Sequence, residues 1–475
     1  MNATRSFSLD DQLHFAALSG DRNLLHVDDV ASRRIQAGAV TVHGVHAVLW
    51  ALDQLSAAGF ALDRVSQIRI RFARFMFLDR DFELRPLSSD AASARFEIVE
   101  GGFQLMTLTL RYGERQTSTA TLCGPVLPAR LVPAALTAKD IAHQRGWLTP
   151  NAPEADFVAA FPQACAILGA RRLQALALLS YLSGMVCPGL HSTTTKLELE
   201  LLHDIQGPSG IGFSADYDAR FRVTNLSVAG SGVAGQVSSL FRSEPVDPPS
   251  MADLIANVAP NEFAGCQALI IGGSRGLGAV TAKIIAAGGG KVVITYAQGA
   301  QEAQAVAADI RAARGPDCCL VRPYDVFDPS PFELAKDAPH PSHMYYFATP
   351  QIYVQKPDQF SPSLFSRFSH VYGTAFEALC RTLSSNQPIT AFYPSTLALE
   401  QRQKGLTEYC MAKAAGEVLC TDLSAQIKRL HVCSVRLPGV LTDQTAGLTG
   451  FSGQDAFSVM APIVRAMQTA PDQVP

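Results

Sequence analysis

The sequence predicts an α+β fold that occurs twice, followed by an α/β fold with a parallel sheet. In each of two successive blocks, a long apolar segment precedes several segments in which apolar and polar residues alternate, as in antiparallel strands. In the last block an apolar strand, a glycine-rich turn, a helix and a second strand follow within about thirty residues, which is typical of a βαβ unit.

Composition narrows the class of protein. The chain has 475 residues and a net charge of −3 without any basic run, so we expect two or three domains and no nucleic-acid partner. The first residues lack the apolar core of a secretory signal. The longest apolar run, residues 173–190, is broken by serines, a glycine and a proline, which favours a buried helix and no membrane contact. Ten cysteines show no zinc-binding spacing, so we expect no metal and a cytoplasmic location.

The first block covers residues 1–125. Its apolar helix is expected at about Gly44–Ala58. The alternating segments that follow it are Gln67–Phe72, Arg95–Val99 and Gln104–Leu110. One long helix followed by an antiparallel sheet is an α+β arrangement.

The second block, residues 126–243, repeats this order with almost no residue identity. A helix is expected over Phe157–Met185. The strand-like segments after it are Thr195–Leu201, Tyr217–Val223 and Gly235–Phe241. Prolines within residues 244–263 then indicate a linker.

The third block, residues 264–475, opens with a nucleotide-binding pattern. The strand Ala268–Ile271 runs into GGSRGLG, and the helix Ala279–Ala287 and the strand Lys291–Thr295 follow. Glycines let the backbone turn sharply and approach a pyrophosphate, and the helix N-terminus supplies N–H donors. Because the glycines stand between a strand and a helix, the pattern predicts a dinucleotide site.

A tyrosine and a lysine downstream have the spacing of one helix face. Tyr409 and Lys413 are four residues apart, so an ammonium is expected beside a phenol. A nearby cation favours the phenolate, which makes Tyr409 a usable proton donor. Ser395, at the end of the strand Ile389–Phe392, could bind the same substrate oxygen. Such a pair alone is usually a solvated helix face, but here it follows a dinucleotide pattern.

These residues together resemble the short-chain dehydrogenase/reductase family, over about residues 264–450. The resemblance implies a Rossmann-type sheet and makes Ser395, Tyr409 and Lys413 catalytic, with Tyr409 protonating a carbonyl oxygen as hydride arrives. It also implies a set of cofactor-binding residues: Gly272, Ser274, Arg275, Gly276, Leu277, Gly278, Asp325, Val326, Lys413, Pro438, Gly439 and Thr442.

The chain departs from the family at two places. Residues 346–350 replace the usual Asn-Asn-Ala-Gly segment, and the family's helix asparagine falls on His370. For the cofactor, no carboxylate follows the second strand to hold a ribose 2′-hydroxyl, and Arg275 could pair with a 2′-phosphate, so NADP(H) is expected. The alternative is that Arg275 is a solvated loop charge.

Near the N-terminus, LSGDRNLLHVD places an acid, an amide and an imidazole within six positions. Taken alone, Asp21, Asn23 and His26 could belong to a capped turn. Together with the Val-His-Gly ahead of the apolar helix, the segment resembles the MaoC-like (R)-specific enoyl-thioester hydratases, with Leu24 where proline is usual. That family has the hot dog fold, a sheet around one helix, and the second block resembles the non-catalytic half of a double hot dog.

The resemblance gives these residues a chemistry. Dehydration of a 3-hydroxyacyl thioester removes an α-proton and protonates the leaving hydroxyl, and Asp21 and His26 are the candidates, with their individual roles open. Asn23 would orient one of them or the hydroxyl. The Gly44 N–H at the start of the central helix could bind the enolate oxygen. His43 either orients that turn or is a packed core histidine.

Combined, the two sites predict reduction of a 3-oxoacyl thioester with NADPH and then dehydration to the trans-2-enoyl form, as in fatty-acid or polyketide synthesis. The substrate would be carried by a separate acyl carrier protein or by coenzyme A, and the chain could form a homo-oligomer. One alternative is a dehydratase with a C-terminal module that binds nucleotide but turns over little. A second is an active reductase on a non-catalytic platform that binds acyl carrier.

Overall fold

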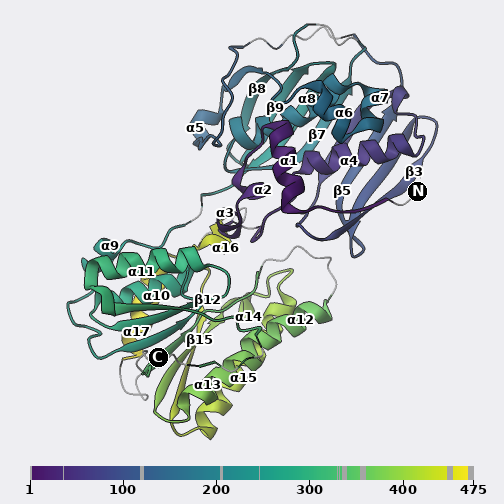
Figure 1. The fold of residues 1–475 in the computed structure, drawn as a ribbon. Helices are drawn as coiled ribbons and strands as arrows, with labels where there is room; N and C mark the ends of the chain where they lie inside the picture. Colours follow the sequence, from purple (N-terminus) through teal and green to yellow (C-terminus); the bar gives the residue numbers. More distant parts are fainter. Residues whose placement is uncertain are drawn as a thin grey trace. The chain divides into compact units, whose positions relative to one another are not determined.

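The structure is a computed structural model that describes residues 3–35, 37–117, 122, 124–203, 207–244, 246–328, 330, 332–333, 340–352, 360–446 and 453–468, with the side chains of 444 and 446 left out. The chain forms two compact units, shown in Figure 1. Unit 1 comprises Met1–Arg33 and Ala37–Glu244, and unit 2 comprises Arg34–Gln36 and Pro245–Pro475.

Unit 1 is built on one ten-stranded antiparallel sheet in the order β1-β3-β4-β5-β2-β7-β10-β9-β8-β6. The strands of its first repeat are β1 (Ala3–Ser6), β2 (Val65–Phe72), β3 (Asp81–Ser89), β4 (Ser93–Glu100) and β5 (Phe103–Tyr112). Those of its second repeat are β6 (Arg145–Leu148), β7 (Ser192–Leu201), β8 (Ile211–Asp218), β9 (Val223–Gly230) and β10 (Val233–Phe241). Pairing of β2 with β7 joins the two repeats into one sheet.

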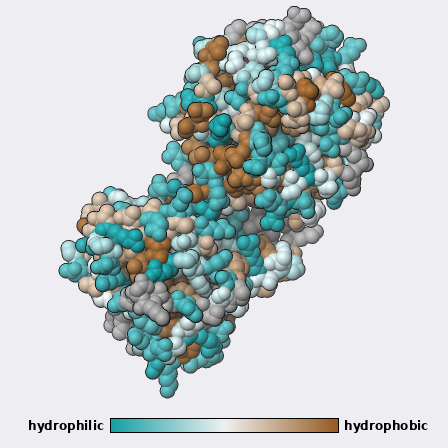
Figure 2. All heavy atoms as spheres, in the orientation of Figure 1, coloured by the Kyte–Doolittle hydropathy of each residue, from teal (hydrophilic) through white to brown (hydrophobic). Residues whose placement is uncertain are grey.

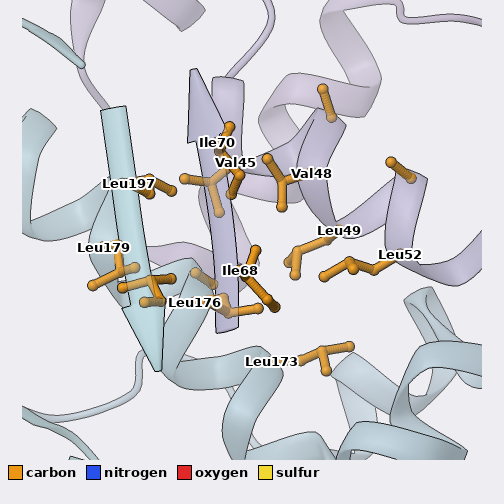
Figure 3. Close-up of a cluster of buried hydrophobic side chains, with 14 of the residues drawn as sticks. Val45, Val48, Leu49, Leu52, Ile68, Ile70, Leu173, Leu176, Leu179 and Leu197 are labelled. Carbon is orange, nitrogen blue, oxygen red and sulfur yellow. The ribbon is translucent and has the colours of Figure 1, made fainter. Parts of the chain in front are cut away.

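Two apolar helices, α4 (Gly44–Ala57) and α8 (Ala170–Tyr181), form the core with this sheet. Figure 3 shows side chains of both helices pointing at the central strands. Val45, Val48, Leu49 and Leu52 come from α4, Leu173, Leu176 and Leu179 from α8, and Ile68, Ile70 and Leu197 from β2 and β7. Their spacing of three and four residues places them on one face of each helix. The predicted order of a helix and then an antiparallel sheet is thus observed in both repeats.

The remaining helices of unit 1 are short. They are α1 (Leu9–Ser19), α2 (Leu24–Val27), α3 (Asp29–Arg33), η1 (Leu62–Arg64), α5 (Ala138–Ile141), α6 (Glu154–Ala160), α7 (Pro162–Leu168) and the π-helical turn η2 (Leu182–Val186). Figure 2 shows apolar side chains gathered on one face of unit 1. The most exposed large apolar residues that the structure describes are Leu131 and Val132, between the two repeats.

Two of the predicted elements are wrong. The helix expected over Phe157–Met185 is instead a series, α6, α7, α8 and η2, and the chain bends by 112° between Pro162–Leu168 and Ala170–Val186. The cause is Gly169, whose φ of +86° is incompatible with a continuing α-helix. No single helix in the described residues is long and apolar enough to cross a membrane, although this bent pair passes by length and composition.

The strand expected over Tyr217–Val223 is a turn between two strands. β8 ends at Asp218 and β9 begins at Val223. The Asp218 side chain accepts a hydrogen bond from the Arg220 backbone N–H at 2.9 Å, and Arg222 has a φ of +54°. An aspartate that binds the backbone two residues later starts a turn, and this local bond outweighs the alternating pattern.

Unit 2 is a six-stranded parallel sheet in the order β13-β12-β11-β14-β15-β16. Its strands are β11 (Gln267–Ile271), β12 (Lys291–Tyr296), β13 (Cys319–Pro323), β14 (His343–Tyr346), β15 (Ile389–Thr396) and β16 (Leu430–Leu437). Read along the sheet, this is the strand order 3-2-1-4-5-6 of the Rossmann-type doubly wound fold. The predicted α/β class of the third block is therefore confirmed, and β15 extends past the predicted end at Phe392 to include Ser395.

Helices cover both faces of this sheet. One face carries α9 (Met251–Ile255), α10 (Gly276–Ala287), α11 (Ala300–Arg314) and α17 (Ala456–Ala466). The other carries α12 (Pro362–Ser369), η4 (His370–Ala375), α13 (Phe376–Ser384) and α15 (Thr407–Gln426). Short segments η3 (Pro316–Cys318), α14 (Ala398–Gln401) and α16 (Asp443–Ala446) connect them. Along β11, Ala268 and Ile270 pack on the first face and Leu269 and Ile271 on the second, so a continuous apolar strand is buried on both sides.

Candidate active sites

In unit 1, the carboxyl group of Asp21 is buried at the end of α1. Gly20, with a φ of +82°, ends that helix and turns the chain so that Asp21 follows directly. Asp21 Oδ2 accepts a hydrogen bond from Ser180 Oγ at 2.6 Å, and Oδ1 accepts one from the Asn23 backbone N–H at 3.0 Å. Burial raises the pKa of Asp21 to about 6, although both hydrogen bonds oppose that shift. A carboxyl group with this pKa can exchange protons near neutral pH.

The second repeat completes the surroundings of Asp21. Ser180 lies on α8 and Gly184 on η2, and a Cβ on Gly184 would overlap the Asp21 carboxylate. The Asn23 side chain donates from Nδ2 to the carbonyl oxygens of Gly184 at 2.8 Å and Gly189 at 3.2 Å. Asn23 also caps α2 by accepting from the Leu25 N–H. Asn23 therefore fixes the loop of the first repeat against the second repeat.

His26 presents a free ring nitrogen. Its Nδ1 lies 2.9 Å from the Thr41 carbonyl oxygen, which can only accept a hydrogen bond, so Nδ1 carries the proton and Nε2 is unprotonated. Among the described residues, none forms a hydrogen bond with Nε2. Burial, together with the charge of Arg242, lowers the pKa of His26 to about 4 against the opposing effect of the Thr41 hydrogen bond. His26 is therefore a neutral imidazole with an available lone pair.

His43 links His26, Asp21 and the start of α4. Its ring stacks on that of His26 with centroids 4.0 Å apart, and its Nε2 lies 3.1 Å from the Asp21 carbonyl oxygen. Its backbone N and its Nδ1 both lie 2.9 Å from Gln12 Oε1. His43 is thus fully buried and also orients the turn before Gly44, which combines the two alternatives that the sequence left open.

Gly44 is the first residue of α4, where the leading N–H groups have no partner within the helix. A Cβ at this position would lie 2.7 Å from the Phe72 ring, so the close approach of that ring requires glycine. The three side chains of Asp21, His26 and His43 also offer metal-ligand atoms within 4.8 Å of one another. Both nitrogens of His43 already face oxygen atoms, so binding a metal there would disrupt its contact with Gln12 or Asp21.

In unit 2, the glycine-rich turn joins β11 to α10. Gly272 and Gly276 have φ values of +80° and +54°, and a Cβ on Gly278 would overlap the Gly272 carbonyl oxygen. Ser274 and Arg275 lie in the turn, with Arg275 at the N-cap of α10 and Leu277 in its first turn. This cradle of glycines before a helix N-terminus has the form of a pyrophosphate site.

The other cofactor residues predicted from the sequence follow β13 and β16, the two edge strands of the sheet. Pro438 and Gly439 follow β16, and Thr442 Cβ would lie 3.9 Å from a Cβ on Gly276. The Asp325 side chain accepts from the Phe327 N–H at 3.0 Å, and the Val326 carbonyl oxygen lies 2.9 Å from His370 Nε2.

Sequence reasoning did not anticipate Asp443 beside this turn. Burial raises the pKa of Asp443 to about 6, and the charge of Arg275 is among those that oppose the rise. Asp443 thus lies within the electrostatic reach of Arg275.

The three predicted catalytic residues of unit 2 lie on β15 and α15. Tyr409 and Lys413 are on α15, with Lys413 Nζ 6.0 Å from the centroid of the Tyr409 ring. Ser395 is on β15, and its hydroxyl donates a hydrogen bond to Glu417 Oε1 at 2.5 Å. Arg436 binds both oxygens of Glu417, and this ion pair lowers the pKa of the Glu417 carboxyl. The serine hydroxyl is thus held by a carboxylate that the sequence motif did not indicate.

A scan of protein-family models and a search of curated proteins found no match. Solved structures do resemble part of the chain. A short-chain dehydrogenase from Shigella flexneri 2a, complexed with NADP, is 15% identical, with 45% of this chain and 95% of that chain covered and a TM-score of 0.40. A short-chain dehydrogenase from Escherichia coli complexed with NADPH is 16% identical, with 44% of this chain and 93% of that chain covered and a TM-score of 0.40. Alternative dihydrofolate reductase 1 from Brucella suis, in complex with NADP, is 16% identical, with 44% of this chain and 91% of that chain covered and a TM-score of 0.37.

Proposed function

We propose that the chain processes the β-carbon of acyl thioesters in two steps. Unit 2 reduces a 3-oxoacyl thioester with NADPH, and unit 1, a double hot dog of the MaoC-like type, dehydrates the resulting 3-hydroxyacyl thioester to the trans-2-enoyl form. The observation that carries the proposal is the pair in unit 1: a buried carboxyl whose pKa is about 6, near a neutral imidazole with a free nitrogen. The acyl group is carried by an acyl carrier protein or coenzyme A.

The geometry favours His26 as the base and Asp21 as the acid in the dehydration. His26 Nε2 has a lone pair and no hydrogen, so it takes the α-proton of the thioester. Asp21 in its acid form then protonates the leaving hydroxyl, which leaves as water. The Gly44 N–H, at the positive end of α4, binds the enolate oxygen that forms in between. Asn23 keeps the loop that carries Asp21 in place through its bonds to the second repeat.

For the reduction, the glycine turn of unit 2 suits the pyrophosphate of NADPH. A Cβ on Gly278 would overlap the Gly272 carbonyl oxygen, so glycine is what allows the tight turn in front of the α10 N-terminus. When bound, NADPH supplies the hydride. Tyr409 protonates the carbonyl oxygen of the substrate, and Lys413, on the same face of α15, stabilises the phenolate that remains. Arg275, at the N-cap of α10, is the candidate partner of the 2′-phosphate.

A second candidate function has its own observation. Because Ser395 donates its hydrogen to Glu417, it cannot at the same time donate to a substrate carbonyl. This favours the alternative in which unit 2 binds a dinucleotide but turns over little, while unit 1 remains a dehydratase.

Mass spectrometry of a 3-oxoacyl thioester incubated with NADPH and the protein separates these functions. The proposal predicts an enoyl product from the wild type, accumulation of the hydroxyacyl form with Asp21→Asn, and no reaction with Tyr409→Phe. Asp10→Asn, an exposed aspartate of α1, is the matched control for the first variant. Dehydration of supplied hydroxyacyl thioester without any reduction would instead support the nucleotide-binding module. Reduction that stops at the hydroxyacyl thioester in the wild type would make unit 1 a platform.

A further inference from the structure

The ammonium group of Lys413 is buried with a single hydrogen-bond acceptor. The residue is 4% exposed, and Nζ donates to the Pro394 carbonyl oxygen at 2.6 Å. An ammonium has three N–H donors, so two remain without an oxygen partner among the residues that the structure describes. Within the described part of the chain, no carboxylate forms an ion pair with Nζ. Direct hydrogen bonds and ion pairs therefore contribute little to keeping this buried group charged.

Aromatic rings surround the ammonium. Nζ lies 3.8 Å from the ring centroid of Tyr372 on η4 and 4.7 Å from that of Tyr393 on β15, with Tyr409 as the third ring. The face of an aromatic ring carries negative potential and attracts a cation, most strongly where water is excluded. Tyr372 is the nearest of the three, so it contributes most.

The Tyr372 ring is held firmly in this position. Its hydroxyl lies 2.5 Å from Thr349 Oγ1, and its ring stacks on Phe368 at a centroid distance of 5.8 Å and an angle of 7°. The same ring meets Tyr409 edge-on at 5.7 Å. Tyr372 therefore contacts both members of the pair that the proposed reduction uses.

We propose that Tyr372 is a positioning residue of unit 2, whose ring face keeps the Lys413 ammonium charged and beside Tyr409. The inference rests on the proposed reduction, in which that charge stabilises the Tyr409 phenolate. His370, which occupies the position of the family's helix asparagine, is bound to the Val326 carbonyl oxygen, and no hydrogen bond joins it to Lys413 among the described residues.

The electrostatic surroundings make the ring's contribution decisive near neutral pH. Burial lowers the pKa of Lys413 to about 7 against the opposing effects of Cys420 and Glu417 on the same helix. The other titratable groups facing the ammonium are the tyrosines, and burial raises the pKa of Tyr372 well above its ordinary value, so its hydroxyl stays neutral. Losing the attraction of one ring would therefore change the charge of Lys413 at physiological pH.

The test is a direct titration of Lys413 in the full-length protein. NMR of protein labelled with ¹³C at lysine Cε follows each lysine with pH, and Lys413→Arg identifies the resonance that belongs to this residue. Tyr372→Leu removes the ring and should lower the pKa of Lys413 by about 1, the order expected for a desolvated cation–π contact. Tyr372→Phe keeps the ring and is the matched control, in which the pKa should stay at the wild-type value.

A second series of variants at position 372 tests the inference even if Tyr372→Leu fails to fold. Phenylalanines with increasing numbers of fluorine atoms at position 372 keep the shape but weaken the negative ring face, so the pKa of Lys413 should fall stepwise. The lower limb of the pH profile for reduction should move with it. A Lys413 pKa that does not respond to this series overturns the inference, whatever the turnover. A stepwise fall in a protein that never reduces 3-oxoacyl thioester would support the ring's role and refute the proposed reduction.

Discussion

The two candidate sites differ in how their polar groups are held. In unit 1 the Asp21 carboxyl group receives hydrogen bonds from both repeats, and the neighbouring imidazole keeps a free nitrogen. In unit 2 the hydroxyl of Ser395 donates its hydrogen bond to Glu417, and Lys413 lies among aromatic rings. A motif therefore identifies the residues of a site. The contacts around those residues decide which of them can exchange a proton with the substrate.

The largest effect on one site alone is expected from a substitution at Gly184. Alanine there would place a Cβ against the Asp21 carboxylate, and a displacement of about 1 Å can cost a hundredfold in rate. We expect Gly184→Ala to lower kcat/KM for dehydration by about a hundredfold or more while reduction continues. Gly265→Ala is the control, because a Cβ there meets no atom within 4 Å. Equal dehydration rates in the two variants would show that Asp21 does not act from the observed position.

The pH dependence of dehydration tests whether Asp21 acts as the acid. The proposed reaction needs Asp21 in its protonated form and His26 in its neutral form at the same time. Since the pKa of Asp21 is raised to about 6 and that of His26 lowered to about 4, this state is abundant between those values. We expect kcat/KM to fall about tenfold for each step of one in pH above 6. A profile that rises through that range would assign Asp21 the role of base.

Much of the fold could be predicted because its signals are local. The apolar faces of α4 and β11 and the glycine turn before α10 are set by neighbouring residues. β3 went unpredicted because Pro86 interrupts its pattern, and the strand register shifts between Pro86 and Ser88. The partners of the sites could not be predicted for the opposite reason. Ser180 lies 159 residues from Asp21 in the sequence, and no local pattern links a helix of the second repeat to a loop of the first.

Ser180 offers a finer test of unit 1. Its hydrogen bond stabilises the Asp21 carboxylate and so lowers the pKa of Asp21 against the effect of burial. Ser180→Ala should move the alkaline limb of the dehydration profile upward by about 1 to 2 pH units, because a hydrogen bond to a charged group contributes about 1.5–3 kcal/mol. Ser183→Ala is the matched control, since Ser183 bonds Thr194 and Ser239 rather than Asp21. An unmoved limb in Ser180→Ala would remove the second repeat from the acid–base chemistry.

The smallest loss of activity is expected from substitution of Ser395. This substitution tests whether the serine of unit 2 is as available to substrate as the groups of unit 1. A serine that already donates to Glu417 has no hydrogen left for the substrate carbonyl, so Ser395→Ala should lower kcat/KM for reduction by less than about tenfold. Glu417→Ala frees that hydrogen, and the additional loss of Ser395 should then cost more than it does in the wild type. The double-mutant cycle measures this coupling as a difference between rate ratios. If Ser395→Ala alone abolishes reduction, the hydroxyl must leave Glu417 during turnover, and unit 2 then assembles its site only when substrate and cofactor are bound.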